Sequence, residues 1–497
     1  MPSIAVFILI ALPWLNPFSP GPSSAIAPLL FSWACAAALL GVIGGVAARP
    51  GAARWVEVTA SAWLVAALLS AGLGLLQYFG ASAELAPWVN STGAGEAFAN
   101  LRQRNQFASL VNIGLVALLW WVAPGHARSG SRDESSGAAR RHGWLLAAIL
   151  LGVGNAASSS RTGLLQLGLV LALALVWGLW RNARARRVLL AAALAYLVAS
   201  VLLPWLAGFD PSSAGTWARL RAGDSVCTSR LTLWGNVLQL IAQKPWFGWG
   251  WGELDYAHFI TLYPGARFCD ILDNAHNLPL QLAVELGIPL TVLIFSVGAG
   301  LVWRAKPWAE AHPTRQLAWG VLAVILLHSL LEYPLWYGPF QMAAALCLGL
   351  LWRHRGASPL PLLTRPLLCG SLSVLILAGV AYAAWDFHRV SQIYQDSSLR
   401  SAAYREHTLE KIQDSRLFQD QVRFAELTTT ALTRDNAAHL RGLALEMMHF
   451  SPEPRVVEKL IESAVVLGRD NEALFYLARY RAAFPEHHAR WARENLR

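Results

Sequence analysis

Long apolar runs separated by short polar segments dominate the first 385 residues of the chain. We place eleven of them, at about 4–18, 26–48, 56–79, 106–124, 143–157, 163–180, 188–208, 280–303, 316–332, 338–352 and 366–385. Each run approaches the roughly 20 residues that a helix needs to cross a hydrocarbon core about 30 Å thick. The pattern predicts an all-α polytopic membrane protein with about eleven transmembrane helices.

Two regions have a different pattern, a long polar loop at 209–279 and the tail at 386–497. In the tail, apolar residues recur at spacings of three and four, which predicts helices at 417–432, 436–450, 453–467 and 471–484. Such paired helices are similar to a tetratricopeptide-like array, which offers a concave face to a protein partner. A small helical cap without a partner is the alternative.

The chain is therefore expected to contain four regions. They are transmembrane helices at 1–208, a loop at 209–279, further transmembrane helices at 280–385 and a helical domain at 386–497.

The distribution of Arg and Lys sets the predicted orientation in the membrane. With the N-terminus in the cytoplasm, the inner loops are 49–55, 125–142, 181–187, 304–315 and 353–365, and they contain 16 Arg or Lys. The outer segments between the predicted spans contain 8, although they are longer in total. Because cytoplasmic loops carry the excess of basic residues, this count predicts a cytoplasmic N-terminus and a C-terminus on the outer side. In a bacterial inner membrane, the loop and the tail would be periplasmic.

Composition narrows the function classes. Hydrophobic residues make up 55% of the chain and charged residues 14%, and the mean hydropathy is +0.40. The tail holds 16 acidic and 16 basic residues, so the net charge of +10 lies in the membrane part and indicates contact with membrane lipids rather than nucleic acid. Met1 leads directly into an apolar run, so the first span is expected to be retained. No metal-ligand spacing or phosphate-binding loop is present, and we expect neither a metal nor a cofactor.

Five cysteines occur, two of them in the outer loop. Cys35, Cys347 and Cys369 fall inside predicted spans, which is typical of buried packing residues. Cys227 and Cys269 either form a disulfide, which an oxidising periplasm permits, or are two free thiols.

A histidine lies at the junction between the polar loop and the eighth apolar run, predicted at about 280–303. His276, in Asp273-Asn274-Ala275-His276-Asn277, lies at the predicted outer membrane surface. An imidazole there is able to take a proton from an acceptor hydroxyl. A histidine that only makes a capping bond is the alternative, and His258 is a weaker rival in the same loop.

Other polar residues cluster at predicted outer ends of spans. Arg161 offers a planar fork of donors suited to phosphate, or it extends to the interface as an ordinary long cation. Arg230 opens an amphipathic helix that ends near Pro245, and a loop of alternating Trp and Gly follows it, including Trp249. Gln103 and Asn105 either line an entrance or cap a helix. His328 and Glu332, four residues apart, share one helix face beside Tyr333. These patterns alone do not separate an enzyme from a transporter.

The order of these motifs resembles that of a known superfamily. The motifs are Gln103-x-Asn105-Gln106, Ser160-Arg161-Thr162-Gly163, Arg230-x-x-x-Trp234, Pro245-Trp246-Phe247-Gly248-Trp249-Gly250, Ala275-His276-Asn277-x9-Gly287 and His328-Ser329-x-x-Glu332-Tyr333-Pro334. Together they resemble the O-antigen ligases and O-oligosaccharyltransferases. The tail from Trp385 to Tyr394 makes the chain similar to the PglL-type bacterial protein O-glycosylation ligases.

The resemblance implies metal-independent transfer of a preassembled glycan from undecaprenyl pyrophosphate to Ser or Thr hydroxyls of a periplasmic protein such as a type IV pilin. It makes His276 the candidate base and places Arg161 and Arg230 on the pyrophosphate. Gln103, Asn105, Trp249, Asn277, His328, Glu332 and Tyr333 are the candidate substrate-binding residues. The chain departs from the family's usual Gln-Pro-Asn, which reads Gln103-Arg104-Asn105 here, and the expected Thr is displaced to Thr291.

Two alternatives remain open at this point. The same chemistry serves an O-antigen ligase that joins the glycan to lipid A-core. A transporter of lipid-linked sugar is the alternative from another class, although the paired broken helices typical of such folds are missing from the pattern.

Overall fold

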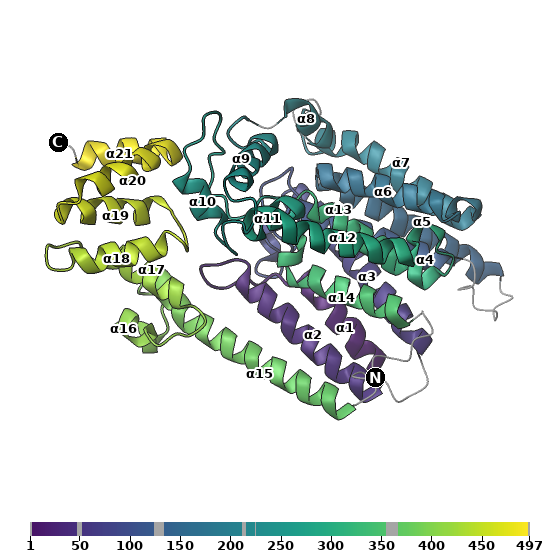
Figure 1. Ribbon diagram of the computed structural model, residues 1–497. Helices are drawn as coiled ribbons and strands as arrows, with labels where there is room; N and C mark the ends of the chain where they lie inside the picture. Colours follow the sequence, from purple (N-terminus) through teal and green to yellow (C-terminus); the bar gives the residue numbers. More distant parts are fainter. Residues whose placement is uncertain are drawn as a thin grey trace. The chain divides into compact units, whose positions relative to one another are not determined.

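The computed structural model describes residues 2–46, 52–123, 134–210, 215–223, 225–353 and 366–495. Within these ranges the regular secondary structure is helical and contains no strand, which confirms the all-α prediction (Figure 1). The basic loops predicted at 49–55 and 125–142 lie partly outside the described residues, and the loop at 353–365 lies almost entirely outside them.

Ten of the predicted apolar runs correspond to single helices. They are α1 Pro2–Leu15, α2 Ile26–Val46, α3 Ala52–Tyr78, α4 Arg104–Val122, α5 Glu134–Ala157, α6 Arg161–Val176, α7 Ala183–Leu206, α13 Pro313–Ser329, α14 Gly338–Arg353 and α15 Pro366–Ser391. Among the described residues, six helices are long and apolar enough to cross a membrane by length and composition. The protein is therefore a multi-pass membrane protein, and the count of eleven spans stays a prediction.

The run predicted at 280–303 is not one helix. It is divided at Gly287 into α11 Leu278–Leu286 and α12 Ile288–Ala305. Gly287 has a φ of +85°, and a Cβ at this position would lie 2.3 Å from the carbonyl oxygen of Trp246. Only glycine accepts both conditions. Hydropathy does not detect this break because apolar residues stand on both sides of it.

The chain forms two compact units, which we describe in turn. Unit 1 comprises 1–222 and 302–381, and unit 2 comprises 223–301 and 382–497. In unit 1, α4 is the central helix, packed against α3, α5, α6 and α13. Nearly all of its residues are buried. The polar residues of α4 therefore face other helices, where they need hydrogen-bond partners.

Unit 2 contains the loop helices and the tail. The helices are α9 Arg230–Gln243, α10 Leu254–Ile260, α16 Thr408–Ile412, α17 Gln419–Thr429, α18 Ala437–Met447, α19 Pro454–Val466, α20 Asp470–Ala483 and α21 Pro485–Asn495. The amphipathic helix predicted after Ser229 is confirmed as α9. The four predicted tail helices are confirmed as α17–α20, while a tetratricopeptide-like character stays a prediction.

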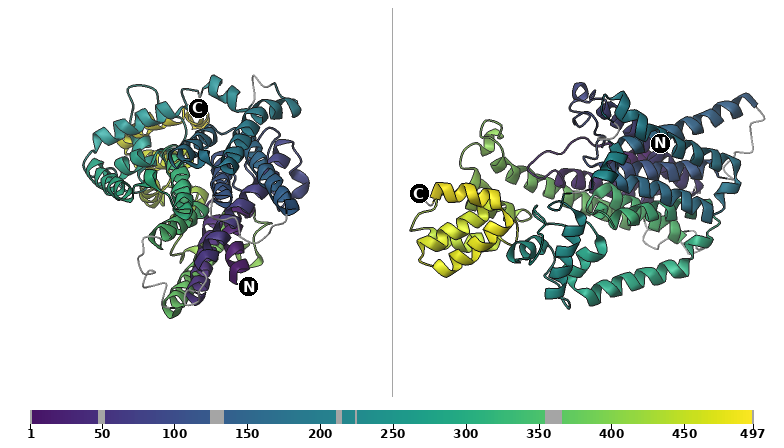
Figure 2. Two further views of the ribbon diagram at one scale, coloured as in Figure 1. Left: turned by 90° about the vertical axis from the view of Figure 1, so that its right-hand side faces the viewer. Right: turned by 90° about the horizontal axis from the view of Figure 1, so that it is seen from above.

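Successive tail helices pack side by side in chain order (Figures 1 and 2). Phe259 of α10 is buried in their core together with Leu460 and Tyr480, so the loop and the tail share one hydrophobic core.

Short elements complete the described structure. Helix α8 spans Gly215–Ala222, and 3-10 turns lie at Ala83–Leu85, Leu179–Arg181, Pro307–Ala309, Pro334–Trp336, Gln392–Tyr394 and Ala402–Tyr404.

Candidate functional site

A buried polar network joins three helix ends in unit 1. The amide nitrogen of Asn105, in the first turn of α4, donates to Glu332 Oε1 at 2.9 Å. The amide oxygen of Asn105 accepts from Ser160 Oγ at 2.5 Å. Ser160 in turn accepts from the backbone N–H of Gly163 at 3.0 Å, which makes it the N-cap of α6. Asn105 thus fixes the start of α6, where Arg161 is the first residue, to the segment that follows α13.

His328 belongs to the same network. Its Nδ1 lies 2.9 Å from Ser109 Oγ, and Gln166 Nε2 donates to the same hydroxyl at 2.7 Å. Ser109 Oγ donates its proton to the carbonyl oxygen of Asn105 at 2.9 Å. A hydroxyl has one donor and two acceptor sites, so Ser109 is able to make all three of these contacts. The ring is fully buried, which holds its orientation.

Close packing of α4 against α6 requires Gly163. A Cβ at this position would lie 2.4 Å from Asn155 Oδ1 and 2.7 Å from the Cβ of Ala108. The carbonyl oxygen of Gly163 accepts from the amides of Asn155 at 3.1 Å and Asn112 at 3.3 Å. The motif Ser160-Arg161-Thr162-Gly163 is therefore a helix start whose backbone is held by side chains of its neighbours.

Gln103 and Tyr333 lie at the edge of this network. The side chain of Gln103 accepts from the backbone N–H of Gln106 at 3.0 Å and so is the N-cap of α4, as the capping alternative expected. Tyr333 is half-buried and stacks on Tyr337, with ring centroids 5.9 Å apart.

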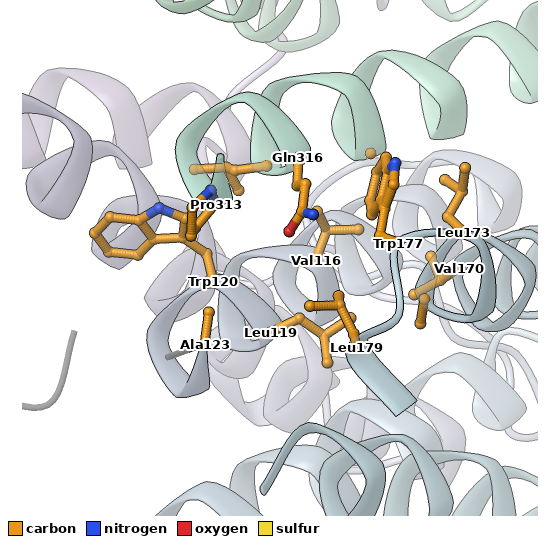
Figure 3. A pocket seen from close by; sticks show the side chains of 13 residues that line it. Val116, Leu119, Trp120, Ala123, Val170, Leu173, Trp177, Leu179, Pro313 and Gln316 are labelled. Atoms are coloured by element: carbon orange, nitrogen blue, oxygen red, sulfur yellow. The ribbon is translucent and has the colours of Figure 1, made fainter. Parts of the chain in front are cut away.

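The opposite ends of α4, α6 and α13 contain an apolar pocket of about 20 Å³ (Figure 3). Val116, Trp120, Val170 and Trp177 line it, and Gln316 is the polar side chain among the labelled residues. A space of this size holds about one water molecule. The three helices therefore have one end with a buried hydrogen-bond network and an opposite end with a small, mostly apolar pocket.

In unit 2, His276 is held in an unusual backbone conformation. Its φ is +49°, in the left-handed region that few non-glycine residues adopt. Its backbone N–H donates to Asn274 Oδ1 at 2.8 Å, and that side chain is buried. The carbonyl oxygen of Ala275 accepts from Trp234 Nε1 at 3.1 Å, and the N–H of Ala275 donates to Gln281 Oε1 at 2.7 Å. These contacts from α9 and α11 fix the backbone of His276, whose imidazole is half-buried.

Asn277 and Arg230 stand at helix starts of unit 2. Asn277 Oδ1 accepts from the backbone N–H of Leu280 at 3.0 Å and caps α11. Arg230 is the first residue of α9 and directly follows its N-cap, Ser229. Arg161 has the same position in α6. Both arginines therefore begin a helix, where the backbone N–H groups and the positive end of the helix dipole favour anions.

The Trp-Gly loop packs against the end of α11. The N–H groups of Trp249 and Gly250 donate to the carbonyl oxygens of Val284 and Glu285 at 2.8 and 3.1 Å. Trp249 Nε1 donates to Leu240, and Lys244 lies 4.0 Å above its ring. The side chain of Trp249 is therefore engaged in contacts within the protein. The exposed rings of this loop belong to Trp246, Phe247 and Trp251, which sequence reasoning did not select.

Cys227 and Cys269 form a disulfide, which decides between the two alternatives. The backbone N–H of Cys269 also donates to the carbonyl oxygen of Cys227 at 3.0 Å. Cys35, Cys347 and Cys369 are free and buried, as predicted.

His258 is a structural residue in this arrangement. It is buried, with Nδ1 2.8 Å from the hydroxyl of Tyr263 and Nε2 3.1 Å from the carbonyl oxygen of Phe268. Burial and the nearby charge of Arg267 lower the pKa of His258 to about 3. It stays neutral at physiological pH, which leaves His276 as the loop histidine available for surface chemistry.

Comparison with known proteins gives three family matches along the chain. Residues 97–122 match a family described as protein glycosylation ligase, 146–295 match O-Antigen ligase, and 316–497 match the C-terminal region of virulence factor membrane-bound polymerases. The resemblance to O-antigen ligases and PglL-type protein ligases is confirmed. The ligase match at 146–295 contains His276, Arg161 and Arg230.

Two curated relatives come from Acinetobacter baylyi. A "General O-oligosaccharyltransferase" is 25% identical over 336 residues, which cover 62% of this chain and 53% of the relative. A "ComP-specific O-oligosaccharyltransferase" is 28% identical over 145 residues, which cover 28% of this chain and 25% of the relative. The matched region thus spans about half the length of one relative and a quarter of the other.

The buried network in unit 1 includes residues that sequence reasoning missed. Ser109, Asn112, Asn155 and Gln166 are all buried and hydrogen-bonded, and none was a candidate. A signal was available, because Asn105, Ser109 and Asn112 recur at helical spacing in an otherwise apolar run. Among the described residues, His, Cys, Asp and Glu side chains form no group of three that is able to hold a metal ion.

Proposed function

We propose that the protein transfers a preassembled glycan from undecaprenyl pyrophosphate to a Ser or Thr hydroxyl of a periplasmic protein, such as a type IV pilin. The ligase match around His276, Arg161 and Arg230 supports this proposal above all, and both curated relatives are named as O-oligosaccharyltransferases. The protein would act in the bacterial inner membrane, with a cytoplasmic N-terminus and a periplasmic C-terminus.

In the proposed reaction, the acceptor oxygen attacks the anomeric carbon of the first sugar. The bond from that carbon to the pyrophosphate oxygen breaks, and the undecaprenyl pyrophosphate leaves with the electron pair. His276 takes the hydroxyl proton as general base. Arg161 and Arg230 bind the pyrophosphate and stabilise the negative charge that develops on it.

The buried network has a positioning role in this proposal. Asn105 connects Ser160, the residue before Arg161, to Glu332. Without this bridge the start of α6 is held less firmly. The backbone position from which the Arg161 side chain extends is then no longer fixed. Asn105, His328, Glu332 and Tyr333 therefore act on the donor side of the proposed site, and Trp249 and Asn277 support the loop that carries His276.

Reconstitution tests the catalytic assignment. Purified protein in proteoliposomes receives an undecaprenyl pyrophosphate-linked glycan and a pilin, and glycosylated pilin is measured by mass. His276→Ala should reduce the transfer rate about 10²–10⁴-fold. Arg161→Lys should remain impaired because it keeps the charge and loses the planar fork. His439→Ala changes an exposed histidine of α18 and is the matched control. Full transfer by His276→Ala, with loss of lipid translocation instead, would favour a transporter.

The O-Antigen ligase match also supports a second acceptor, lipid A-core. A strain without this protein separates the two. Loss of glycan mass from pilin, with lipopolysaccharide keeping its O-chain, supports protein glycosylation, and the reverse result supports lipopolysaccharide ligation.

A further inference from the structure

The loop of alternating Trp and Gly in unit 2 exposes three large aromatic side chains. The exposed fraction is 71% for Trp246, 89% for Phe247 and 68% for Trp251. Phe247 is the most exposed large hydrophobic side chain among the residues that the structure describes. A cluster of exposed apolar rings in one loop marks a surface that contacts a partner or a membrane.

The backbone of this loop is fixed against α11. The N–H of Gly252 donates to Glu285 Oε1 at 2.9 Å, in addition to the bonds that Trp249 and Gly250 make to the end of α11. A Cβ at Gly248 would lie 2.3 Å from the carbonyl oxygen of Glu285, so the two backbones are in direct contact there. The loop is therefore packed backbone to backbone on α11, and the three exposed rings extend from a fixed support.

The same loop adjoins the first turn of α12. The N–H of Ile288, the first residue of α12, donates to the carbonyl oxygen of Pro245 at 2.8 Å. The segment Ile288–Ala309 is long and apolar enough to cross a membrane, and nearly all side chains of α12 are exposed. Because Trp246 directly follows Pro245, the exposed rings lie where the exposed apolar surface of α12 begins. The loop thus continues a surface that itself requires lipid.

The chemistry of the loop suits the headgroup layer of a membrane. Residues 245–252 contain no charged side chain, and indole N–H groups are the polar atoms of their side chains. Trp is typical of membrane–water interfaces because its ring is apolar while its N–H reaches polar groups. Lys244, directly before the loop, is exposed, and its long side chain is able to extend to lipid phosphate. A sugar would require partners for several hydroxyls, which these side chains do not supply.

We propose that Trp246, Phe247 and Trp251 insert into the headgroup layer around the first turn of α12 and anchor the loop that carries His276. The anchor is bonded to the end of α11, and Asn277 caps the start of the same helix. The nine residues of α11, about 14 Å along its axis, separate the anchor from His276. Insertion therefore sets the position of His276 relative to the bilayer. This consequence for catalysis rests on the proposed function, whereas the insertion itself does not.

Spin labels on the full-length protein measure the insertion, in vesicles of phosphatidylethanolamine and phosphatidylglycerol. Phe247→Cys carries the label, and Leu474→Cys places the same label on an exposed apolar residue of α20 as the control. The unsubstituted protein gives the background, because its free cysteines are buried. Collisions with oxygen, which concentrates in lipid, and with a water-soluble nickel chelate report the depth. The label at 247 should favour oxygen and lie about 5–10 Å into the boundary between headgroups and acyl chains, whereas the label at 474 should favour the chelate.

Other occupants of this surface predict other results. A label at 247 that is shielded from both oxygen and the chelate would indicate a protein contact. A label that reports water until an undecaprenyl pyrophosphate-linked glycan is added would indicate a glycan site. Either result, or equal accessibility to the chelate at 247 and 474, would overturn the lipid anchor.

A double substitution tests the consequence for catalysis. Trp246→Ser with Phe247→Ser should lower kcat/KM about tenfold for a donor embedded in vesicles, because the bilayer no longer fixes the site relative to the donor. In detergent with a short-chain donor, the same variant should stay within about twofold of the wild type, because no bilayer sets the position there. Val465→Ser with Leu474→Ser removes exposed apolar side chains from the tail and is the matched control, with rates within about twofold in both media.

The outcomes separate the anchor from the proposed function. An equal loss of rate in vesicles and in detergent would mean that the two rings act only on the fold, and an unchanged rate in vesicles would mean that they do not position the site. Both results would overturn the positioning by the anchor and retain the proposed transfer. A lipid-embedded label at 247 in a protein that transfers no glycan would refute the proposed function and retain the anchor.

Discussion

The candidate residues of unit 1 and unit 2 occupy the same kind of position and are held in different ways. In both units an arginine follows a serine N-cap, Ser160 before Arg161 and Ser229 before Arg230. In unit 1 the surrounding side chains are buried and bond to each other through Asn105 and Ser109. In unit 2 the bonds run mainly to backbone groups, and a disulfide closes the loop. The candidate residues of unit 1 are therefore held by buried side chains, whereas the loop around His276 in unit 2 is held at a few backbone points and by the disulfide.

Removing the disulfide should expose this difference most strongly. The variant Cys227→Ser with Cys269→Ser opens a loop of 42 residues, which in the chain-entropy treatment costs about 4 kcal/mol of stability. Unit 2 should then unfold at a temperature well below that of unit 1, which holds no disulfide in its described residues. Thermal unfolding followed by hydrogen exchange of individual peptides measures this. A uniform loss of protection in both units would contradict the comparison.

Breaking the network in unit 1 should have the next largest effect. Asn105→Leu removes one hydrogen-bond partner from Ser160 and one donor from Glu332, and should cost about 2–4 kcal/mol because lost hydrogen bonds of buried polar groups are expensive. Chemical denaturation measured by tryptophan fluorescence reports the loss.

A double variant shows whether Asn105 also matters for function. Asn105→Leu with Glu332→Leu removes both partners, so stability should recover by about 1–3 kcal/mol. Glycan transfer should stay low, because the connection between α6 and the segment after α13 is still missing. Recovery of transfer together with stability would reduce the network to a purely structural role.

The sequence predicted the parts of the structure that depend on local patterns. Apolar runs became helices because a bilayer requires them, and spacings of three and four identified α17–α20 because each buries one stripe. The capping alternative for Gln103 was equally local.

Contacts between distant residues were not accessible in the same way. Asn105 and Glu332 are 227 residues apart, and no periodicity predicts that pairing. The break at Gly287 depends on a close approach of Trp246, which is likewise a tertiary property. The burial of Asp255 was not predictable for the same reason. It arises where the loop and the tail of unit 2 pack together.

Asp255 provides the smallest and most specific test of the comparison, because its carboxyl in unit 2 accepts from a backbone N–H, while Glu332 in unit 1 accepts from a side chain. Burial raises the pKa of Asp255 from 3.8 to about 7. Between these values the folded state binds more protons than the unfolded state, so the contribution of Asp255 to stability falls as pH rises from about 4 to about 7. His258 contributes the opposite slope below about pH 6.5, because it is neutral in the folded state and protonated in the unfolded chain, and this contribution is common to the wild type and the variant below.

Asp255→Asn removes this titration. The variant should therefore match the wild type near pH 4 and exceed it by about 1–3 kcal/mol near pH 8, after allowance for relaxation around the buried group. Melting temperatures measured across this pH range provide the test, with Asp270→Asn as an exposed carboxylate control in the same loop. An equal stability difference at both pH values would mean that Asp255 does not titrate in the folded protein.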